Sequence, residues 1–517
     1  MAMHWFSGVA ASAVLTLMAP TVMSSAPVAK PTAEQLQWQD YEIGLMVHWN
    51  LQTICAPKSA GKVSEQRCQA DSKTEGPLYV PSLDAVAQWN PSKLDTDQWA
   101  RAAVAIGAKY VVMVVDHMTG FTWFNTKFHN FSVAHTQYKG GGADLLREYI
   151  DSCRKYGLKV GFFYSVHYNW FLGVDDFKLG HPPLGGRNYT TEEYLAVVAG
   201  QLEEIVTAFG KDGPMEVWFD GGLGPHAGFI SELLMGIAPR AICHSCSAYS
   251  NKAGAVRWMG NEAGVMPLPS WAAASNTSHY NGDPRAAFFV PPSCDIVLRE
   301  HYWFHQNDTE QYMKSPVQLL YNYLTSVGRA SNLIVNLSPD GSGAIPDLDM
   351  QRYEQLGQAI KCLFSEPLAS SKDALDALPM DVNGFIEWSF PVVTSKNVSI
   401  VLREDQHDGQ LIGDYLLECR NASSQAFEIC RMGAIEHVIP SEPYAGIGHK
   451  RILMLAPEVP FDALRLVVWS HYAVGMQVPT LRDIELFDWT RVEHCLSCLE
   501  QAQQLREHGR PVQDLIA

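Results

Sequence analysis

Basic residues are scarce in this chain of 517 residues, which has 38 Lys and Arg against 55 Asp and Glu and a net charge of -17. No run of Lys or Arg stands out, and this argues against nucleic acid or an anionic membrane surface as the main partner. No apolar run after residue 26 approaches membrane-spanning length. Internal repeats and low-complexity tracts are also lacking. The composition, 47% hydrophobic and 18% charged, is that of a globular protein long enough for two domains or one large barrel with an appendage.

The first 26 residues differ from the rest of the chain. Trp5 to Met18 is an apolar run with small residues, and Ser24-Ser25-Ala26 follows it. Because the run is too short to cross a bilayer and no stop-transfer pattern follows, residues 1–26 are predicted to be a cleaved signal peptide. We therefore expect a secreted or lysosome-like protein. The glycosylation sequons agree with secretion, and they begin at Asn130, Asn188, Asn276, Asn307, Asn336, Asn397 and Asn421.

The cysteines number eleven, which is compatible with a few disulfides and at least one free thiol. The local pairs Cys55 with Cys68 and Cys419 with Cys430 are the first disulfides to expect. Two segments, Cys243-His-Ser-Cys246 and Cys495-Leu-Ser-Cys498, have metal-like spacing, but each stands alone in its neighbourhood. We therefore expect no zinc site and no cofactor.

Residues 32–365 alternate between strand-like and helix-like stretches. Residues 190–209, for example, open with Thr-x-Glu-Glu capping chemistry, stop at Gly210 and lead into a strand ending at Asp220. This alternation predicts an α/β fold with a parallel sheet, and its extent favours a catalytic (β/α)8-like barrel. Residues 370–490 alternate with a period of two and predict a C-terminal β-sandwich. Residues 491–517 are expected to form a helical tail.

Asp220 ends the segment Met215 to Gly222, which reads as a buried strand closed by two glycines. An ionised carboxylate is costly to bury, so one at the C-terminal end of a barrel strand is usually placed for use. The alternative is an Asp that caps the next turn. Other strands end in similar residues, namely His48 and Trp49, Asp116 and His117, Tyr164 and His167, Trp218, His244, and Arg257 with Glu262.

In a barrel the C-terminal strand ends share one pocket. Aromatic rings, neutral hydrogen-bonding groups and a few carboxylates are what a sugar requires, because its C–H faces stack on rings and its hydroxyls need donors and acceptors. The sequence therefore predicts a carbohydrate site at this end of the barrel.

The amino-acid sequences of these segments resemble those of the α-L-fucosidases of glycoside hydrolase family 29. Tyr41 to Trp49, Gly157 to Ser165 and Val217 to Gly221 are similar to three strands of that family. Val256-Arg-Trp-Met-Gly-Asn-Glu262 resembles the acid/base segment of the subgroup that acts on α-1,3/1,4-linked fucose. The resemblance implies a retaining, exo-acting α-L-fucosidase with fucosylated oligosaccharides or glycoproteins as substrates.

By the same resemblance, Asp220 is the nucleophile and Glu262 the general acid/base. The residues expected to hold fucose are His48, Trp49, His117, Tyr164, Trp218 and Arg257. Retention requires two carboxyls about 5–5.5 Å apart. Glu216 and Glu300 are competing acids: Glu216 shares a strand face with Trp218, and Glu300 is expected to form a structural ion pair.

Three other interpretations of the function stay open. A catalytically inactive barrel would make the chain a secreted fucose- or glycan-binding protein, and interception of a covalent intermediate by a sugar would make it a transfucosidase. A metal-dependent hydrolase would use His48, His117, His167 and Asp220. Such barrels usually carry a paired His-x-His on the first strand, where this chain has only His48.

Overall fold

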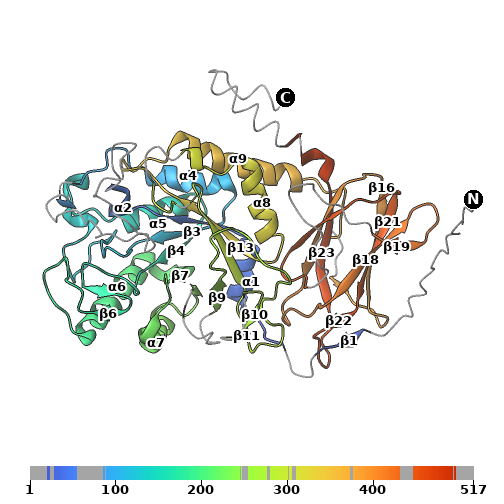
Figure 1. Cartoon of the computed structure of the whole chain (residues 1–517), viewed down its shortest axis with the longest axis horizontal. Coiled ribbons are helices and arrows are strands. Elements are labelled where there is room, and N and C mark those ends of the chain that lie inside the picture. The colour runs from blue at the N-terminus through green and yellow to red at the C-terminus, as the bar shows by residue number, and fades with distance from the viewer. Residues whose placement is uncertain are drawn as a thin grey trace, which may run out of the picture.

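The computed structural model has two parts that lie side by side, a barrel formed by the first part of the chain and a β-sandwich formed by the last (Figure 1). It describes residues 20–23, 28–54, 86–87, 89–244, 246, 254–275, 280–300, 302–305, 310–372, 377–430, 446–492 and 494–495.

Eight strands close into a barrel in which every neighbouring pair is parallel. In chain order they are β2 (Ile43–Val47), β3 (Tyr110–Val114), β4 (Lys159–Phe163), β7 (Glu216–Trp218), β8 (Ile242–His244), β9 (Ala255–Trp258), β12 (Pro292–Ile296) and β13 (Asn332–Leu337). The predicted (β/α)8-like barrel is confirmed.

Helices cover the outside of the barrel, and several begin where the sequence predicts. Those around the barrel are α2 (Leu51–Ile54), α4 (Thr96–Ile106), α5 (Leu145–Lys155), α6 (Thr191–Phe209), α7 (Ala227–Ile237), α8 (Pro316–Ser326) and α9 (Asp347–Phe364), whereas α1 (Ala33–Asp40) packs Trp38 against Ile242 and Val256 on the inner face of the strands. The α6 cap is the predicted capping box, with Thr190 Oγ1 accepting from the Glu193 backbone N–H at 3.2 Å and Glu193 accepting from the Thr190 N–H at 2.9 Å. This capping box satisfies two backbone N–H donors that the first turn of the helix leaves unpaired.

Alternation along each strand divides the barrel residues into two layers. Odd-numbered residues of β7 and β2, such as Val217 and Leu45, pack outward against the helices. Their even-numbered neighbours pack inside the barrel, because successive strand side chains point to opposite faces. The inner cluster consists of Met46, Tyr110, Val112, Val114, Phe163, Trp218 and Ile334.

After α9 the chain forms two antiparallel sheets that face each other, which confirms the predicted sandwich. One sheet contains β14 (Ala369–Ser370), β23 (Thr480–Asp488), β17 (Val398–Glu404) and β20 (Arg451–Leu455), with β15 (Leu378–Pro379) paired to β23. The other contains β16 (Phe385–Val393), β21 (Phe461–Val468), β18 (Tyr415–Asn421) and β19 (Phe427–Ile429). A separate apolar core of inward residues from both sheets fills the space between them.

An ion pair between the buried Lys450 and the half-buried Glu42 joins the sandwich to the barrel. Lys450 Nζ donates to both carboxylate oxygens of Glu42 at 2.8 Å and to the Tyr323 hydroxyl at 2.9 Å. Burial acts to raise the pKa of Glu42, but Lys450 and Arg403 outweigh it and lower that pKa to about 2. The charge on Glu42 is therefore kept across the ordinary pH range. The ion pair with Lys450 holds the start of β2 against the sandwich.

Thr21–Val22, inside the stretch predicted to be a signal peptide, forms strand β1 and pairs in parallel with β22 (Ser470–His471) of the sandwich. Residues 1–19 and 24–27 lie outside the described residues, as does most of the predicted tail 491–517. No described helix is long and apolar enough to cross a membrane.

Six of the described cysteines form the disulfides Cys243–Cys246, Cys362–Cys495 and Cys419–Cys430, and Cys153 and Cys294 are buried free thiols. The Cys419–Cys430 prediction is confirmed, and Cys55 and Cys68 lie outside the described residues. Cys243 and Cys246 pair with each other, and Cys495 reaches back to α9. Sulfurs in disulfides cannot ligate zinc as thiolates, which removes Cys243, Cys246 and Cys495 as zinc ligands, while Cys498 lies outside the described residues.

Candidate active site

Every strand of the barrel contributes a side chain at or near its C-terminal end to one region. Met46 on β2 points into the barrel, and His48, two residues later, therefore points into it as well. The polar and aromatic groups that meet there are His48, His117, Phe163, Trp218, Asp220, His244, Trp258, Glu262, Asp295 and Asn336. The predicted convergence of strand ends is therefore present.

Asp220 and Glu262 lie in the same site. Asp220 lies two residues after the end of β7 and is partly exposed, whereas Glu262 is exposed on the loop after β9. Burial raises the pKa of Asp220, His167 and the Gly221 backbone N–H lower it, and the charge on Glu262 raises it further. The two carboxylates are thus close enough to interact electrically, although β8 lies between β7 and β9, the strands that they follow. The charge on His167 and the Gly221 N–H therefore both favour the ionised form of Asp220.

The loop that carries Glu262 is held against β12 and adopts an unusual backbone conformation. Glu262 itself has a φ of +48°, in the left-handed region that a residue with a side chain seldom occupies. The Gly264 N–H donates to the Asp295 carbonyl at 3.1 Å, and Ala263 forms a bridge with Ile296. Trp303 Nε1 donates to Glu262 Oε2 at 3.3 Å. These contacts hold the loop against β12 and the Glu262 carboxylate beside Trp303.

His48 is tied to Trp303 through Asn336 on β13. His48 Nδ1 lies 2.7 Å from Asn336 Oδ1, and Asn336 Nδ2 donates to the Trp303 carbonyl at 2.7 Å. The His48 ring packs 4.8 Å from that of Trp303, measured between centroids. Since Trp303 also contacts Glu262, one chain of contacts connects three strand ends. The signal for Asn336 was a polar residue at an inward position of a buried strand, which sequence reasoning treated only as a sequon.

Two histidines of the site are held neutral. Burial lowers the pKa of His48 to about 4, and burial together with the nearby His48 lowers the pKa of His117 to about 3. His117 stacks on Phe163 with an interplanar angle of 15°. A neutral imidazole offers one donor and one acceptor, so both rings are suited to uncharged hydroxyl groups.

Asp295 is a third carboxyl of the site, and sequence reasoning missed it. It is buried at the end of β12, and its Oδ1 accepts from Trp258 Nε1 at 2.9 Å. Burial raises the pKa of Asp295 to about 7, with the charges on Glu262 and Asp220 adding to the effect. Asp295 is therefore mostly protonated in acid and gains its charge near neutrality. A carboxylate on the inward face of a short buried strand was the available signal.

Asp295→Asn is expected to move the alkaline limb of the activity profile to lower pH. In the wild type the charge that Asp295 acquires near pH 7 opposes loss of the proton from the neighbouring Glu262. Asparagine keeps the acceptor for Trp258 and removes that charge, so Glu262 loses its proton more readily. Measuring kcat/KM from pH 4 to 9 tests this; an alkaline limb that stays in place, or moves upward, contradicts it.

Two predicted sugar contacts, Trp49 and Tyr164, are wrong because both side chains point away from the barrel interior. Each is 0% exposed in the layer between strands and helices. Trp49 packs against Trp89, Trp99 and Trp123 and donates to the Asp340 carbonyl at 2.8 Å. Tyr164 donates to Gln201 Oε1 on α6 at 2.5 Å. Alternation along the strand decides this: next to an inward His48, Trp49 must point outward.

The predicted fucose contact of Arg257 is also wrong. Its neighbours on β9, Val256 and Trp258, point inward, and Arg257 points outward. The guanidinium is buried and donates to three backbone carbonyls, those of Trp271 at 2.6 Å, Val290 at 2.7 Å and Tyr280 at 3.3 Å. Arg257 therefore holds a loop and does not face the sugar site.

The competing acids lie elsewhere. Glu216 is buried deep in the barrel, accepts from Trp38 Nε1 at 2.8 Å, and has its pKa raised to about 8 by burial. Glu300 forms an ion pair as expected, but with Lys314 at 2.6 Å, because Arg299 is committed to Asp349. In the described part of the chain, no three His, Cys, Asp or Glu side chains are grouped to hold a metal ion.

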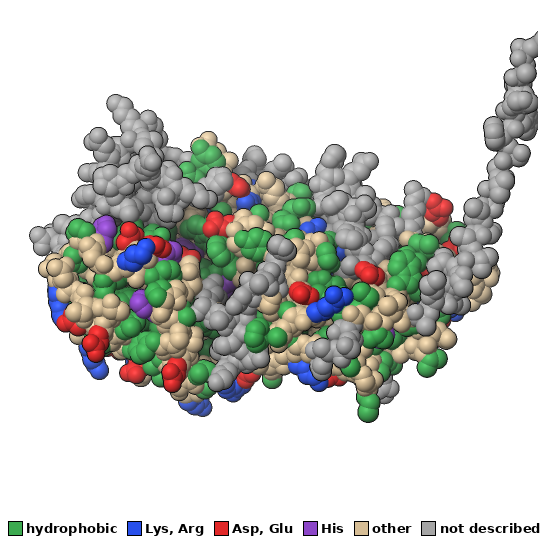
Figure 2. Space-filling view, turned by 60° about the horizontal axis from the view of Figure 1, so that its bottom comes forward, with side chains coloured by type: hydrophobic (Ala, Val, Ile, Leu, Met, Phe, Trp, Pro, Cys, Tyr) green, Lys and Arg blue, Asp and Glu red, His purple; other side chains and the backbone are tan. Residues whose placement is uncertain are grey.

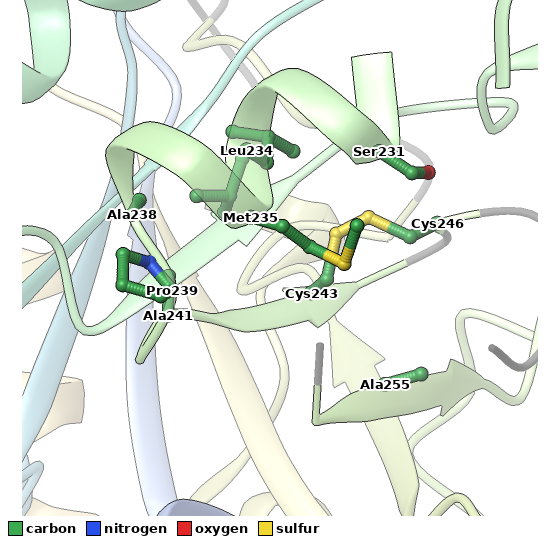
Figure 3. A pocket seen from close by; sticks show the side chains of 10 residues that line it. Ser231, Leu234, Met235, Ala238, Pro239, Ala241, Cys243, Cys246 and Ala255 are labelled. Carbon is green, nitrogen blue, oxygen red and sulfur yellow. A yellow bond between two sulfur atoms is a disulfide. The ribbon is translucent and has the colours of Figure 1, made fainter. Parts of the chain in front are cut away.

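The molecular surface agrees with a site at the C-terminal end of the barrel. In the space-filling view, acidic and histidine side chains gather around a hollow in the barrel half of the molecule (Figure 2). A separate apolar pocket lies on the outer side of the barrel between α7 and β8, lined among others by Leu234, Met235 and the Cys243–Cys246 disulfide (Figure 3). Its strand residues, such as Val217, belong to the outward layer, so it is not part of the carboxylate site.

A parallel eight-stranded barrel with paired carboxylates among aromatic rings and neutral histidines at its C-terminal end is the architecture of a glycoside hydrolase. The α-L-fucosidase family matches residues 19–362, which is more than half of the chain. The chain therefore belongs to the α-L-fucosidase family of glycoside hydrolases.

Individual relatives and solved structures agree with this family assignment. The chain is 25% identical over 481 residues to Alpha-L-fucosidase 1 of Arabidopsis thaliana, an alignment that covers 85% of this chain and 84% of the plant protein. A Ruminococcus gnavus GH29 fucosidase in complex with fucose has a similar fold, with a TM-score of 0.65, 18% identity, and coverage of 90% of this chain and 97% of that one. A glycoside hydrolase 29 family member from an unknown rumen bacterium aligns with a TM-score of 0.68 at 22% identity, covering 89% of this chain and 78% of that one.

Proposed function

We propose that this protein is a retaining, exo-acting α-L-fucosidase that removes terminal α-1,3/1,4-linked fucose from oligosaccharides or glycoproteins. The observation that supports the proposal is that Asp220, after β7, and Glu262, after β9, lie at the same end of the barrel, where the charge on Glu262 raises the pKa of Asp220. Family membership supports fucose as the sugar. The α-1,3/1,4 preference rests on the resemblance of the segment Val256 to Glu262.

In the first step the ionised carboxylate of Asp220 attacks the anomeric carbon, and Glu262 gives its proton to the departing glycosidic oxygen. The Asp220–carbon bond forms as the carbon–oxygen bond breaks, which leaves a fucosyl ester. His167 beside Asp220 favours the charged nucleophile that this step needs. Neutral His48 and His117 hydrogen-bond the sugar hydroxyls, and the Trp218 ring, stacked on His244, forms an aromatic wall.

In the second step Glu262 removes a proton from water, and the hydroxide attacks the anomeric carbon while the Asp220 carboxylate leaves. Esterification removes the negative charge of Asp220, so Glu262 becomes more acidic just when it must act as a base. Two inversions at one carbon give net retention.

The test is to follow hydrolysis of a Lewis-type trisaccharide, 2'-fucosyllactose and an aryl α-L-fucoside by proton NMR. We expect α-L-fucose to appear first and the β anomer only by later mutarotation, with the trisaccharide hydrolysed faster than 2'-fucosyllactose. First appearance of the β anomer would contradict retention, and a preference for 2'-fucosyllactose would contradict the linkage. Binding without turnover would identify a glycan-binding protein, and fucosylated acceptor products a transfucosidase.

We also infer that the protein acts outside the cytosol. The disulfides Cys362–Cys495 and Cys419–Cys430 support this, because such bonds persist in oxidising compartments. The predicted signal peptide and the sequons point the same way.

A further inference from the structure

The connection between β9 and β12 is built differently from the other described connections. Instead of a helix it contains a short hairpin, β10 (Ala273–Ala274) paired with β11 (Phe288–Phe289). The Arg257 guanidinium lies beneath it and donates to carbonyls on both arms, at Trp271 and Val290, and near its tip at Tyr280. One buried side chain thus ties both arms of the hairpin to β9, the strand that leads to Glu262.

Gly282 allows this close approach. Its φ is +79°, and a Cβ at this position would lie 2.6 Å from the carbonyl oxygens of both Trp271 and Ala273 and 3.1 Å from an Arg257 nitrogen. The Asp283 N–H donates to the Ala273 carbonyl at 2.9 Å, which closes the turn. The loop is therefore held on a fixed base.

Tyr280 is carried by this loop to the rim of the active site. Its side chain is 61% exposed although it is a large aromatic residue. A Cβ built on Gly260 would lie 3.5 Å from the Tyr280 hydroxyl oxygen and 3.7 Å from its ring. Gly260 precedes Glu262 in the same short segment, so the ring of this largely exposed residue lies next to the acid/base loop.

We propose that Tyr280 is a platform on which the sugar that carries fucose stacks, and that Arg257 is the positioning residue that holds it there. This inference rests on the proposed function. Glu262 must reach the glycosidic oxygen, so the sugar on the far side of that oxygen has to leave past the Glu262 loop. An exposed ring at that place offers the apolar face that the C–H side of a sugar ring requires. The connection therefore contributes to the choice of glycan, not to recognition of fucose.

The test compares a Lewis-type trisaccharide with α-L-fucosyl fluoride, whose leaving group has no ring. Tyr280→Ala is expected to lower kcat/KM for the trisaccharide about tenfold, the scale of one aromatic contact, and to leave the fluoride almost unchanged. Tyr280→Phe should keep the trisaccharide activity. Arg257→Met should show the same selective loss, and the double variant Arg257→Met/Tyr280→Ala should lose no more than Tyr280→Ala alone.

Phe229→Ala, at an exposed aromatic residue on α7, is the matched control and should change neither substrate. Equal losses on both substrates, or no loss on the trisaccharide with Tyr280→Ala, would overturn the proposal. A wild-type protein that hydrolyses neither substrate would instead refute the proposed function, so the two failures are distinguishable.

Discussion

Asp220→Gly is expected to lower kcat on an aryl α-L-fucoside by about 10⁴-fold or more, because no group then forms the bond to the anomeric carbon. Sodium azide should restore part of the turnover, since this small anion fits the space that the carboxylate leaves. Azide would attack from the Asp220 side while Glu262 protonates the leaving group. The expected product is therefore the inverted β-L-fucosyl azide, identified by its anomeric coupling in proton NMR.

Glu300→Ala is the matched control for this experiment. Its carboxylate is paired with Lys314 on a loop after β12, and it is expected to keep wild-type turnover and to be insensitive to azide. An Asp220→Gly variant that stays active without azide, or that forms the α-azide, would remove Asp220 from the nucleophile role.

Glu262→Ala is expected to lower kcat/KM on a natural oligosaccharide by about 10³-fold, in the range for loss of a general acid. The loss should be smaller for an aryl fucoside with a good leaving group, because that group departs without a proton. With such a substrate the fucosyl ester on Asp220 accumulates, since water is no longer activated. Azide should then accelerate turnover and give the α-azide, the opposite anomer to that expected with Asp220→Gly.

Glu216→Gln provides the comparison for Glu262. Glu216 is fully buried and accepts from Trp38, and glutamine keeps that acceptor, so we expect no dependence of the rate loss on the leaving group. If the leaving-group dependence appears with Glu216→Gln and is missing with Glu262→Ala, the acid role belongs to Glu216.

The strands and helices of the barrel could be predicted because each is a local pattern. A buried apolar run, a capping box or a glycine stop reflects interactions within a few residues, as the capping box at Thr190 shows. The same holds for Asp220, whose position follows from a short strand closed by two glycines. Adjacent residues just after the end of a strand were harder to assign to the site. His48 and Trp49 follow the same strand, but only one of two adjacent residues can face the barrel axis.

Residues that reach the site from other parts of the chain could not be predicted from local pattern. Asn336, Trp303 and Asp295 act through partners far away in the sequence, such as the bond from Asn336 to His48. Arg257 was misassigned for the same reason. Its three carbonyl partners belong to a hairpin whose return over β9 depends on the close approach at Gly282.

By itself the amino-acid sequence determined the order of strands and helices, the barrel followed by a sandwich, and the two acidic residues placed at strand ends, because periodicity and turn chemistry act over short distances. Only the tertiary structure decided which side chains face the sugar and which face the helices, and that Asp295 joins Asp220 and Glu262 in one electrostatic cluster. Closure of the barrel brings strands from distant parts of the chain together, and their mutual burial and charge set the pKa values on which the chemistry depends.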